Sequence, residues 1–165
     1  MIKGLHHNAY RCRDSEQTRR FYEEFLGLRL AGTLDIGETK SGRKTATLHT
    51  FYELGDGSYL AFFEAPDLPF EFKPQHDFDL HIALEVDPDV LERMFAKGKA
   101  GGIETRGITD HGFIRSIYFR DPNGYVIELT AKLPGHDQAM DPVTNGARAK
   151  LDQWQAAKQP APSRT

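Results

Sequence analysis

The sequence predicts an α+β fold, in which two βαβββ modules follow one another and form a curled mixed sheet around a cavity. Two observations support it. The order strand, helix and three strands occurs once in each half, and residues of the first half match residues of the second at a regular offset that becomes shorter at the hairpins. His7 corresponds to His81 and Gly27 to Gly101, an offset of 74 (81 − 7), whereas at the closing hairpins Gly57 corresponds to Gly124, an offset of 67 (124 − 57). A repeat of this kind indicates duplication of one supersecondary unit.

In the first module, a strand is expected at 5–12 and a helix at 16–26. Asp14 or Ser15 offers an N-cap for this helix, and Gly27 ends it. Three further strands are expected at 28–36, 45–54 and 58–66. The last two flank a Gly-Asp-Gly turn and therefore predict a hairpin.

The second module repeats this order. A strand is expected at 80–86, a helix ending in glycines at 87–102 and a short strand at 103–107. A hairpin of 113–120 and 125–131 follows, joined at Asp121-Pro122-Asn123-Gly124. This tetrapeptide is expected to act as a turn and nothing more.

The domain is placed at residues 1–134, with modules at about 3–66 and 78–132. A C-terminal extension occupies 135–165. Within it, 143–157 predicts one exposed helix and 158–165 a loose tail.

Composition narrows the function classes. The net charge is −3, which gives no electrostatic footprint for nucleic acid or an anionic membrane. No segment is apolar enough for a membrane span or a signal peptide, and Cys12 is the only cysteine. We therefore expect a cytoplasmic protein that binds neither nucleic acid nor membranes.

Side-chain alternation along the strands brings a group of polar residues to one face. His7, His81 and Glu128 all lie on the side of their strands away from the helices, as does Tyr118. Two imidazoles and one carboxylate can bind one divalent metal, whether Fe(II), Mn(II), Zn(II), Ni(II) or Co(II). Three protein ligands leave positions open for a chelating substrate, as is typical of catalytic metal sites.

Two strings in the sequence, GLHHNAYRCRDSEQTRRFYEEFLGLRL and SIYFRDPNGYVIEL, resemble the vicinal oxygen chelate superfamily over about residues 3–132. That superfamily includes glyoxalase I, methylmalonyl-CoA epimerase, fosfomycin-resistance thiol transferases and type I extradiol dioxygenases. Its pattern implies metal ligands on the first, fifth and eighth strands, at His7, His81 and Glu128.

Within the superfamily, the ligand pattern is most similar to that of type I extradiol dioxygenases. Members with four ligands take one from the fourth strand, but the corresponding position is Ala61 (128 − 67), and Glu64 is expected to face the other side. In the dioxygenases and the fosfomycin transferases a tyrosine lies ten residues before the last ligand, as Tyr118 does here (128 − 118). The resemblance implies catalytic roles for Tyr118 and for His111, whose loop position is similar to that of a non-ligating dioxygenase histidine.

Substrate-binding residues are expected on the third and fourth strands, where His49, Phe51, Tyr59 and Phe63 share the cavity face. Three aromatic rings favour an apolar or aromatic substrate. We therefore expect an Fe(II) extradiol ring-cleavage dioxygenase that acts on a catecholic small molecule and forms a homodimer. A glutathione or thiol transferase, lyase or isomerase of the same superfamily remains an alternative, as does a non-catalytic small-molecule binding protein. The sequence leaves open whether the site is built within one chain or across two.

Overall fold

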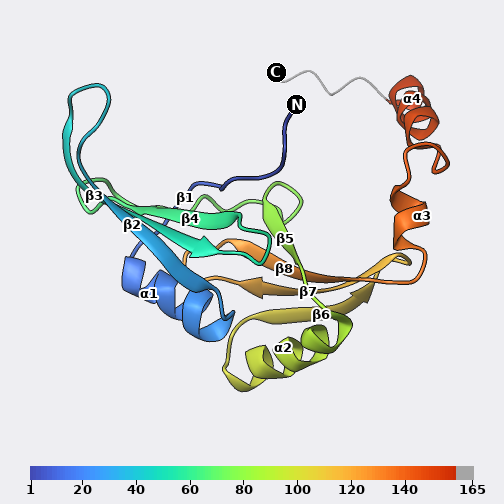
Figure 1. Ribbon diagram of the computed structural model, residues 1–165, viewed down its shortest axis with the longest axis horizontal. Helices are drawn as coiled ribbons and strands as arrows, with labels where there is room; N and C mark the ends of the chain where they lie inside the picture. The colour runs from blue at the N-terminus through green and yellow to red at the C-terminus, as the bar shows by residue number, and fades with distance from the viewer. Residues whose placement is uncertain (159–165) are drawn as a thin grey trace.

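The structure, a computed structural model that describes residues 1–158, contains two four-stranded mixed sheets with the helices α1 and α2 beneath them (Figure 1). The first sheet has the order β1-β4-β3-β2 and the second the order β5-β8-β7-β6. In each sheet the first pair is parallel and the other two pairs are antiparallel. The expected α+β class with tandem βαβββ modules is confirmed. The two sheets remain separate and do not close into a barrel.

The strands lie close to their expected positions. Those of the first sheet are β1 (Tyr10–Arg11), β2 (Arg29–Glu38), β3 (Lys44–Glu53) and β4 (Tyr59–Glu64). Those of the second are β5 (His81–Glu85), β6 (Thr105–Asp110), β7 (Ile114–Arg120) and β8 (Val126–Lys132). The first strand is shorter than expected, and His7 joins it only through an isolated parallel bridge to Tyr59.

Strand pairing follows the sequence repeat residue by residue. Tyr10 pairs with Phe62 in the first sheet. Adding 74 and 67 gives Leu84 and Leu129, which pair in the second sheet. Phe51 pairs with Ala61, and adding 67 to both gives Tyr118 and Glu128, which also pair. The modules therefore share one register, and Ala61 occupies the position that corresponds to Glu128.

The helix of the first module has two parts, α1 (Ser15–Arg19) and the π-helical η1 (Arg20–Phe25). The Asp14 side chain caps it by accepting a hydrogen bond from the Gln17 amide at 2.7 Å. Gly27, at φ +86°, lies in the left-handed region just after the helix, as its stop role requires. In the second module α2 (Pro88–Ala100) follows Asp87 with Pro88 at its first turn.

One apolar core joins the two modules. Phe25 at the end of η1 meets Phe119 of β7 edge-on, with ring centroids 5.1 Å apart. Lys97 of α2 donates a hydrogen bond to the Phe25 carbonyl at 2.6 Å. The most deeply buried large side chains of this core are Tyr22, Tyr52, Leu60, Phe62, Ile117, Phe119 and Ile127.

The turn between β7 and β8 does more than reverse the chain, which corrects the expectation from its sequence. Asp121 and Asn123 are 4% and 2% exposed. Tyr22 of η1 donates to the Asp121 carboxylate at 2.9 Å, and the Arg13 amide donates to the Asn123 side-chain oxygen at 2.9 Å. Because these donors belong to the first module, the turn is a buried polar connection between modules.

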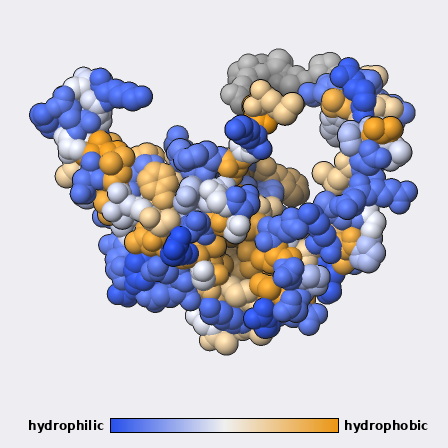
Figure 2. All heavy atoms as spheres, viewed as in Figure 1, coloured by the Kyte–Doolittle hydropathy of each residue, from blue (hydrophilic) through white to orange (hydrophobic). Residues whose placement is uncertain are grey.

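The C-terminal extension contains two helices, α3 (His136–Met140) and α4 (Ala147–Ala157). One helix was expected at 143–157, so α4 starts later, and α3 was not expected. Gly135 and Gly146 precede them, both with positive φ. Together they form an arm, residues 133–158. Leu133 and His136 contact Phe113 at its base, and beyond this point the arm stands clear of the body (Figures 1 and 2). Of the tail expected at 158–165, residues 159–165 lie outside the described part. No helix within residues 1–158 is long and apolar enough to cross a membrane.

Candidate metal and substrate site

A cavity of about 460 Å³ opens on the face of the second sheet away from α2. Four of the residues expected at the site line it: His81 on β5, Glu128 on β8, Tyr118 on β7 and His111 in the preceding loop. They meet because β5, β8 and β7 are neighbours and their alternate residues share a face. The rest of the lining is His76, Asp77, Phe78, Arg106, Phe113, Ile114 and Val126.

His81 and Glu128 face each other across the parallel β5–β8 pair, with Nε2 and Oε2 3.3 Å apart. The other nitrogen of the ring, Nδ1, lies 2.9 Å from the Asp77 carbonyl oxygen. Since a carbonyl only accepts, Nδ1 carries the proton and donates it. Glu128 is held in a similar way, because Thr130 donates to its Oε1 at 3.2 Å and leaves Oε2 directed at His81.

This arrangement fits a divalent metal. In a neutral His81 ring the hydrogen bond to Asp77 leaves a lone pair on Nε2, directed at a carboxylate oxygen that also carries lone pairs. A cation between His81 Nε2 and Glu128 Oε2 would remove the repulsion between their lone pairs. Two atoms ~2.1 Å from one metal at about a right angle lie ~3 Å apart, close to the separation seen. The hydrogen bond to Nδ1 is the contact that metal-ligating histidines make to fix the ring.

Tyr118 and His111 form a hydrogen-bonded pair beside these two residues, with Tyr118 Oη and His111 Nε2 3.0 Å apart. Partial burial raises the pKa of Tyr118, and the negative charge of Glu128 raises it further. The hydroxyl therefore stays protonated at neutral pH and can donate a hydrogen bond. His111 is exposed to solvent.

Two other cavity residues, Arg106 and Asp77, were not expected from the sequence. Arg106 of β6 lies over the Tyr118 ring, with its guanidinium carbon 5.7 Å from the centroid, and forms an ion pair with Asp77. Asp77, in the loop before β5, also pairs with Arg120, and the two arginines hold the pKa of its carboxyl below the usual range. The loop that orients His81 is therefore tied to β6 and β7. Arg106 pairs with Tyr118 across β6 and β7, and only this strand register could have pointed to it.

The remaining expected residues gather on the first sheet. His49 stacks on Phe63 with ring centroids 3.6 Å apart, and its Nδ1 lies 2.9 Å from the Phe62 carbonyl oxygen. His7 meets the edge of the Phe51 ring at 5.6 Å, and Phe51 meets Tyr59 at 6.2 Å. His7, His49, Phe51, Tyr59 and Phe63 thus form one aromatic patch, in which His7 is exposed.

The single chain does not bring His7 to His81 and Glu128. His7 is absent from the lining of their cavity, and no group of three or more metal-ligating side chains comes together within residues 1–158. His6 lies beside His7, with the two Nδ1 atoms 2.8 Å apart. One chain therefore offers two half-sites, the aromatic patch with His7 and the cavity with His81 and Glu128.

Neither Ala61 nor Glu64 supplies a fourth ligand in this chain. Ala61 is fully buried. The Glu64 carboxylate accepts a hydrogen bond from the Ser15 amide at 2.7 Å, at the start of α1, and so caps that helix.

Comparison with known proteins agrees with this architecture. The sequence model of the Glyoxalase/Bleomycin resistance protein/Dioxygenase superfamily matches residues 4–129. The metallothiol transferase FosB of Shouchella clausii is 25% identical over 139 residues, which cover 78% of this chain and 80% of that protein. A lactoylglutathione lyase of Neisseria meningitidis is 29% identical over 140 residues, which cover 81% and 94%.

A solved structure shares the fold. The fosfomycin resistance protein FosX from Listeria monocytogenes, complexed with Mn(II) and sulfate, aligns with a TM-score of 0.62 and 20% identity over 84% of this chain and 99% of that one. The chain belongs to the Glyoxalase/Bleomycin resistance protein/Dioxygenase superfamily. Members of this superfamily bind a divalent metal and act on small molecules.

Proposed function

We propose that this protein is a metal-dependent enzyme of the extradiol ring-cleavage type, acting on a catecholic small molecule. The hydrogen-bonded pair of Tyr118 and His111 beside His81 and Glu128 carries the proposal. It places a hydroxyl donor and a proton carrier next to the two residues best arranged to hold a metal. Phe78, Phe113 and Ile114 provide apolar surface for a ring in the same cavity.

The metal would be held by His81 and Glu128 of one chain and by His7 of a second copy. His7 is exposed, and the single chain lacks a third ligand next to His81 and Glu128 within its described residues. In a two-fold dimer, each of the two half-sites would face its complement. Such a dimer would also bring His49, Phe51, Tyr59 and Phe63 to the substrate as the opposite wall.

The chain's own residues would then orient the substrate and move its proton. Tyr118, whose raised pKa keeps it protonated, would donate a hydrogen bond to a substrate oxygen as negative charge develops there. His111 would accept the catechol proton and return it to the product. Fe(II) at the site would supply the redox chemistry with O2 that ring cleavage requires.

The test is anaerobic loading with Fe(II), followed by O2-uptake measurements with monocyclic and bicyclic catechols. We expect O2 consumption and a yellow ring-opened product. Metal content is measured on the same sample, so that the readout is interpreted only for loaded protein. Fully loaded protein that consumes no O2 with any catechol would refute the dioxygenase assignment.

A second candidate is metal-dependent thiol transfer or a lyase reaction, because the relatives carry the names metallothiol transferase and lactoylglutathione lyase. Arg106 in the cavity favours this alternative, since it could pair with an anionic substrate group. Turnover of a thiol and an electrophile by the Mn(II)-loaded protein, in the absence of O2 uptake, would establish the alternative.

A further inference from the structure

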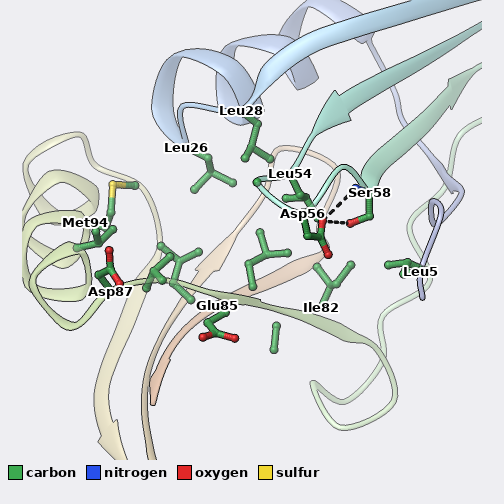
Figure 3. Close-up of a pocket in the computed structure, with 16 residues that line it drawn as sticks. Leu5, Leu26, Leu28, Leu54, Asp56, Ser58, Ile82, Glu85, Asp87 and Met94 are labelled. Carbon is green, nitrogen blue, oxygen red and sulfur yellow. Dashed lines mark hydrogen bonds between the residues drawn. The ribbon is translucent and has the colours of Figure 1, made fainter. Parts of the chain in front are cut away.

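The ring of His81 lies between two hydrogen-bond acceptors. Its strand β5 is at the edge of the second sheet, and 38% of the His81 side chain is exposed. Ile82 lines the groove between the modules (Figure 3), so the preceding residue, His81, points to the other side of the strand, toward the cavity. On that side the Asp77 carbonyl oxygen lies 2.9 Å from Nδ1, and Glu128 Oε2 lies 3.3 Å from Nε2.

A neutral His81 ring carries one proton, for which the two acceptors compete. In the Nδ1–H form the ring donates to the Asp77 carbonyl and leaves the Nε2 lone pair free for a metal. In the Nε2–H form the ring donates to Glu128, so the two atoms that would hold the metal are bonded to each other. A hydrogen bond to a carboxylate is roughly twice as strong as one to a neutral acceptor. The Nε2–H form therefore predominates unless the Asp77 carbonyl is held in place.

The loop that supplies this carbonyl, residues 74–79, has few other contacts that fix it. Within residues 1–158, its only hydrogen bond between backbone groups is internal, from the Asp79 amide to the His76 carbonyl. Its large apolar side chain, Phe78, is 88% exposed. Neither apolar burial nor backbone pairing with another element therefore explains the position of the Asp77 carbonyl.

The carboxylate of Asp77 ties the loop to the second sheet. Arg106 of β6 pairs with Oδ2 at 2.5 Å, and Arg120 at the end of β7 pairs with Oδ1 at 3.3 Å. Arg120 is held in turn, because its Nε lies 3.1 Å from the Glu104 carboxylate and its Nη1 donates to the Gly124 carbonyl at 2.9 Å. We call Asp77, Arg106, Arg120 and Glu104 the charge clamp. An isolated exposed ion pair contributes little, whereas charges joined in a network can fix a position.

The strand register places both arginines of the charge clamp on the cavity face. Arg106 pairs with Tyr118 across β6 and β7, and Arg120 follows Tyr118 by two residues on β7. Because residues two apart on a strand share a face, both guanidinium groups start on the side of Tyr118 and of its β8 partner Glu128. The clamp is therefore part of the wall beside the candidate metal ligands.

We propose that Arg106 and Arg120 are positioning residues that act through Asp77. The charge clamp holds the Asp77 carbonyl against His81 Nδ1 and so keeps the ring in the Nδ1–H form, with Nε2 free before any metal binds. The benefit for metal binding rests on the proposed function. The form of the ring does not, because it is a property of the metal-free chain and needs no second copy.

Nitrogen-15 NMR of the metal-free, full-length protein distinguishes the two forms, because protonated and unprotonated ring nitrogens differ in chemical shift. The His81 signals are identified by their loss in His81→Gln. Spectra are recorded at about pH 9, well above the ordinary pKa of imidazole. We expect the Nδ1–H form to predominate in the wild type and the Nε2–H form in Asp77→Ala.

Asp67→Ala is the matched control. Asp67 also pairs with an arginine, Arg43, and its side chain is 33% exposed against 29% for Asp77, but it does not line the His81 cavity. This variant should keep the Nδ1–H form. A wild type already in the Nε2–H form, or equal spectra of Asp77→Ala and Asp67→Ala, would overturn the proposal.

Arg106→Gln tests the clamp without changing the loop itself. It should raise the share of the Nε2–H form by less than Asp77→Ala does, because Arg120 still holds Asp77. This variant also decides the question if Asp77→Ala does not fold. An unchanged share of the two forms in Arg106→Gln would show that Arg106 has no positioning role.

The affinity for Zn(II) gives a second readout. Loss of a group that orients a metal-binding histidine typically weakens metal binding about 10–100-fold, so we expect the Kd of Asp77→Ala for Zn(II) to exceed that of Asp67→Ala at least about 10-fold. Equal Kd values in the two variants would overturn the role of the clamp at the metal. A wild type that binds no Zn(II) would count against the proposed function, whereas the NMR comparison would still decide whether the clamp positions His81.

Discussion

Replacing Asn123 by alanine should destabilise the whole domain, because this side chain connects the modules. Asn123 is 2% exposed. Its oxygen accepts from the Arg13 amide at 2.9 Å, and its nitrogen donates to Thr18 Oγ1 at 3.2 Å and to the Asp121 carboxylate at 3.1 Å. The bonds to Arg13 and Thr18 cross from the β7–β8 turn to the first module.

The expected magnitude follows from these three bonds. A buried polar group left without its partner costs about 1–3 kcal/mol, and a bond to a charged group contributes about 1.5–3 kcal/mol. Since Arg13 lies at the surface and Thr18 keeps its bond to the Asp14 carbonyl, water and remaining partners offset part of the loss. We expect Asn123→Ala to lower the free energy of unfolding by about 3–4 kcal/mol. For a domain of this size that corresponds to a decrease in Tm of about 6–16 °C.

Urea unfolding followed by circular dichroism measures the change, with the slope of the transition compared between variants. Asn145→Ala is the matched control, because Asn145 lies on the exposed arm and, within residues 1–158, its side chain bonds only to the Ala139 carbonyl and the Ala147 amide of that arm. It should alter the free energy of unfolding by less than about 1 kcal/mol. If Asn123→Ala and Asn145→Ala are equally stable, the turn does not join the modules and the reasoning fails.

Three further predictions concern the site and the packing around it. Tyr118→Phe should lower kcat by about 10²-fold while metal content, measured by elemental analysis, stays at the wild-type level, because in the proposed mechanism the hydroxyl binds substrate and not the metal. A parallel loss of metal would contradict that role. Gly98→Ala should destabilise the domain by about 1–3 kcal/mol in thermal unfolding, because the added Cβ would overlap the Thr105 hydroxyl and lie 2.6 Å from Phe119 Cε1. Gly37→Ala is the control and should not destabilise it, because the space around that Cβ is open. Little lactoylglutathione lyase activity is expected with any divalent metal, because Ala61 stands at the fourth-strand ligand position and Glu64 caps α1. Substantial conversion of a hemithioacetal to its thioester would overturn the assignment of three ligands.

The sequence predicted most of the fold, because the repeat fixes both modules at once. Once the Tyr10–Phe62 pair is known, the two offsets alone give its counterpart Leu84–Leu129. The residues that share a sheet face could also be predicted, because alternation along β5, β7 and β8 places His81, Tyr118 and Glu128 on one side.

What sequence reasoning missed depends on contacts between distant segments. The link from Asp121 to Tyr22 joins residues far apart in the chain, and a turn motif carries no sign of it. The position of Arg106 depends on the register of β6 against β7. The separation of His7 from His81 reflects how the two sheets are arranged, which alternation within a strand cannot fix.

The metal content of a mixed dimer shows whether the metal centre is shared between two copies. His7→Ala and Glu128→Ala are purified with different tags, combined, and isolated as the heterodimer. Each homodimer should bind little metal, because every site lacks one ligand. A shared centre predicts about half the wild-type metal content in the heterodimer, since one of its two sites regains His7, His81 and Glu128. His6→Ala, as control, should retain the wild-type content. A heterodimer as empty as its parents would show that no centre is shared between the copies.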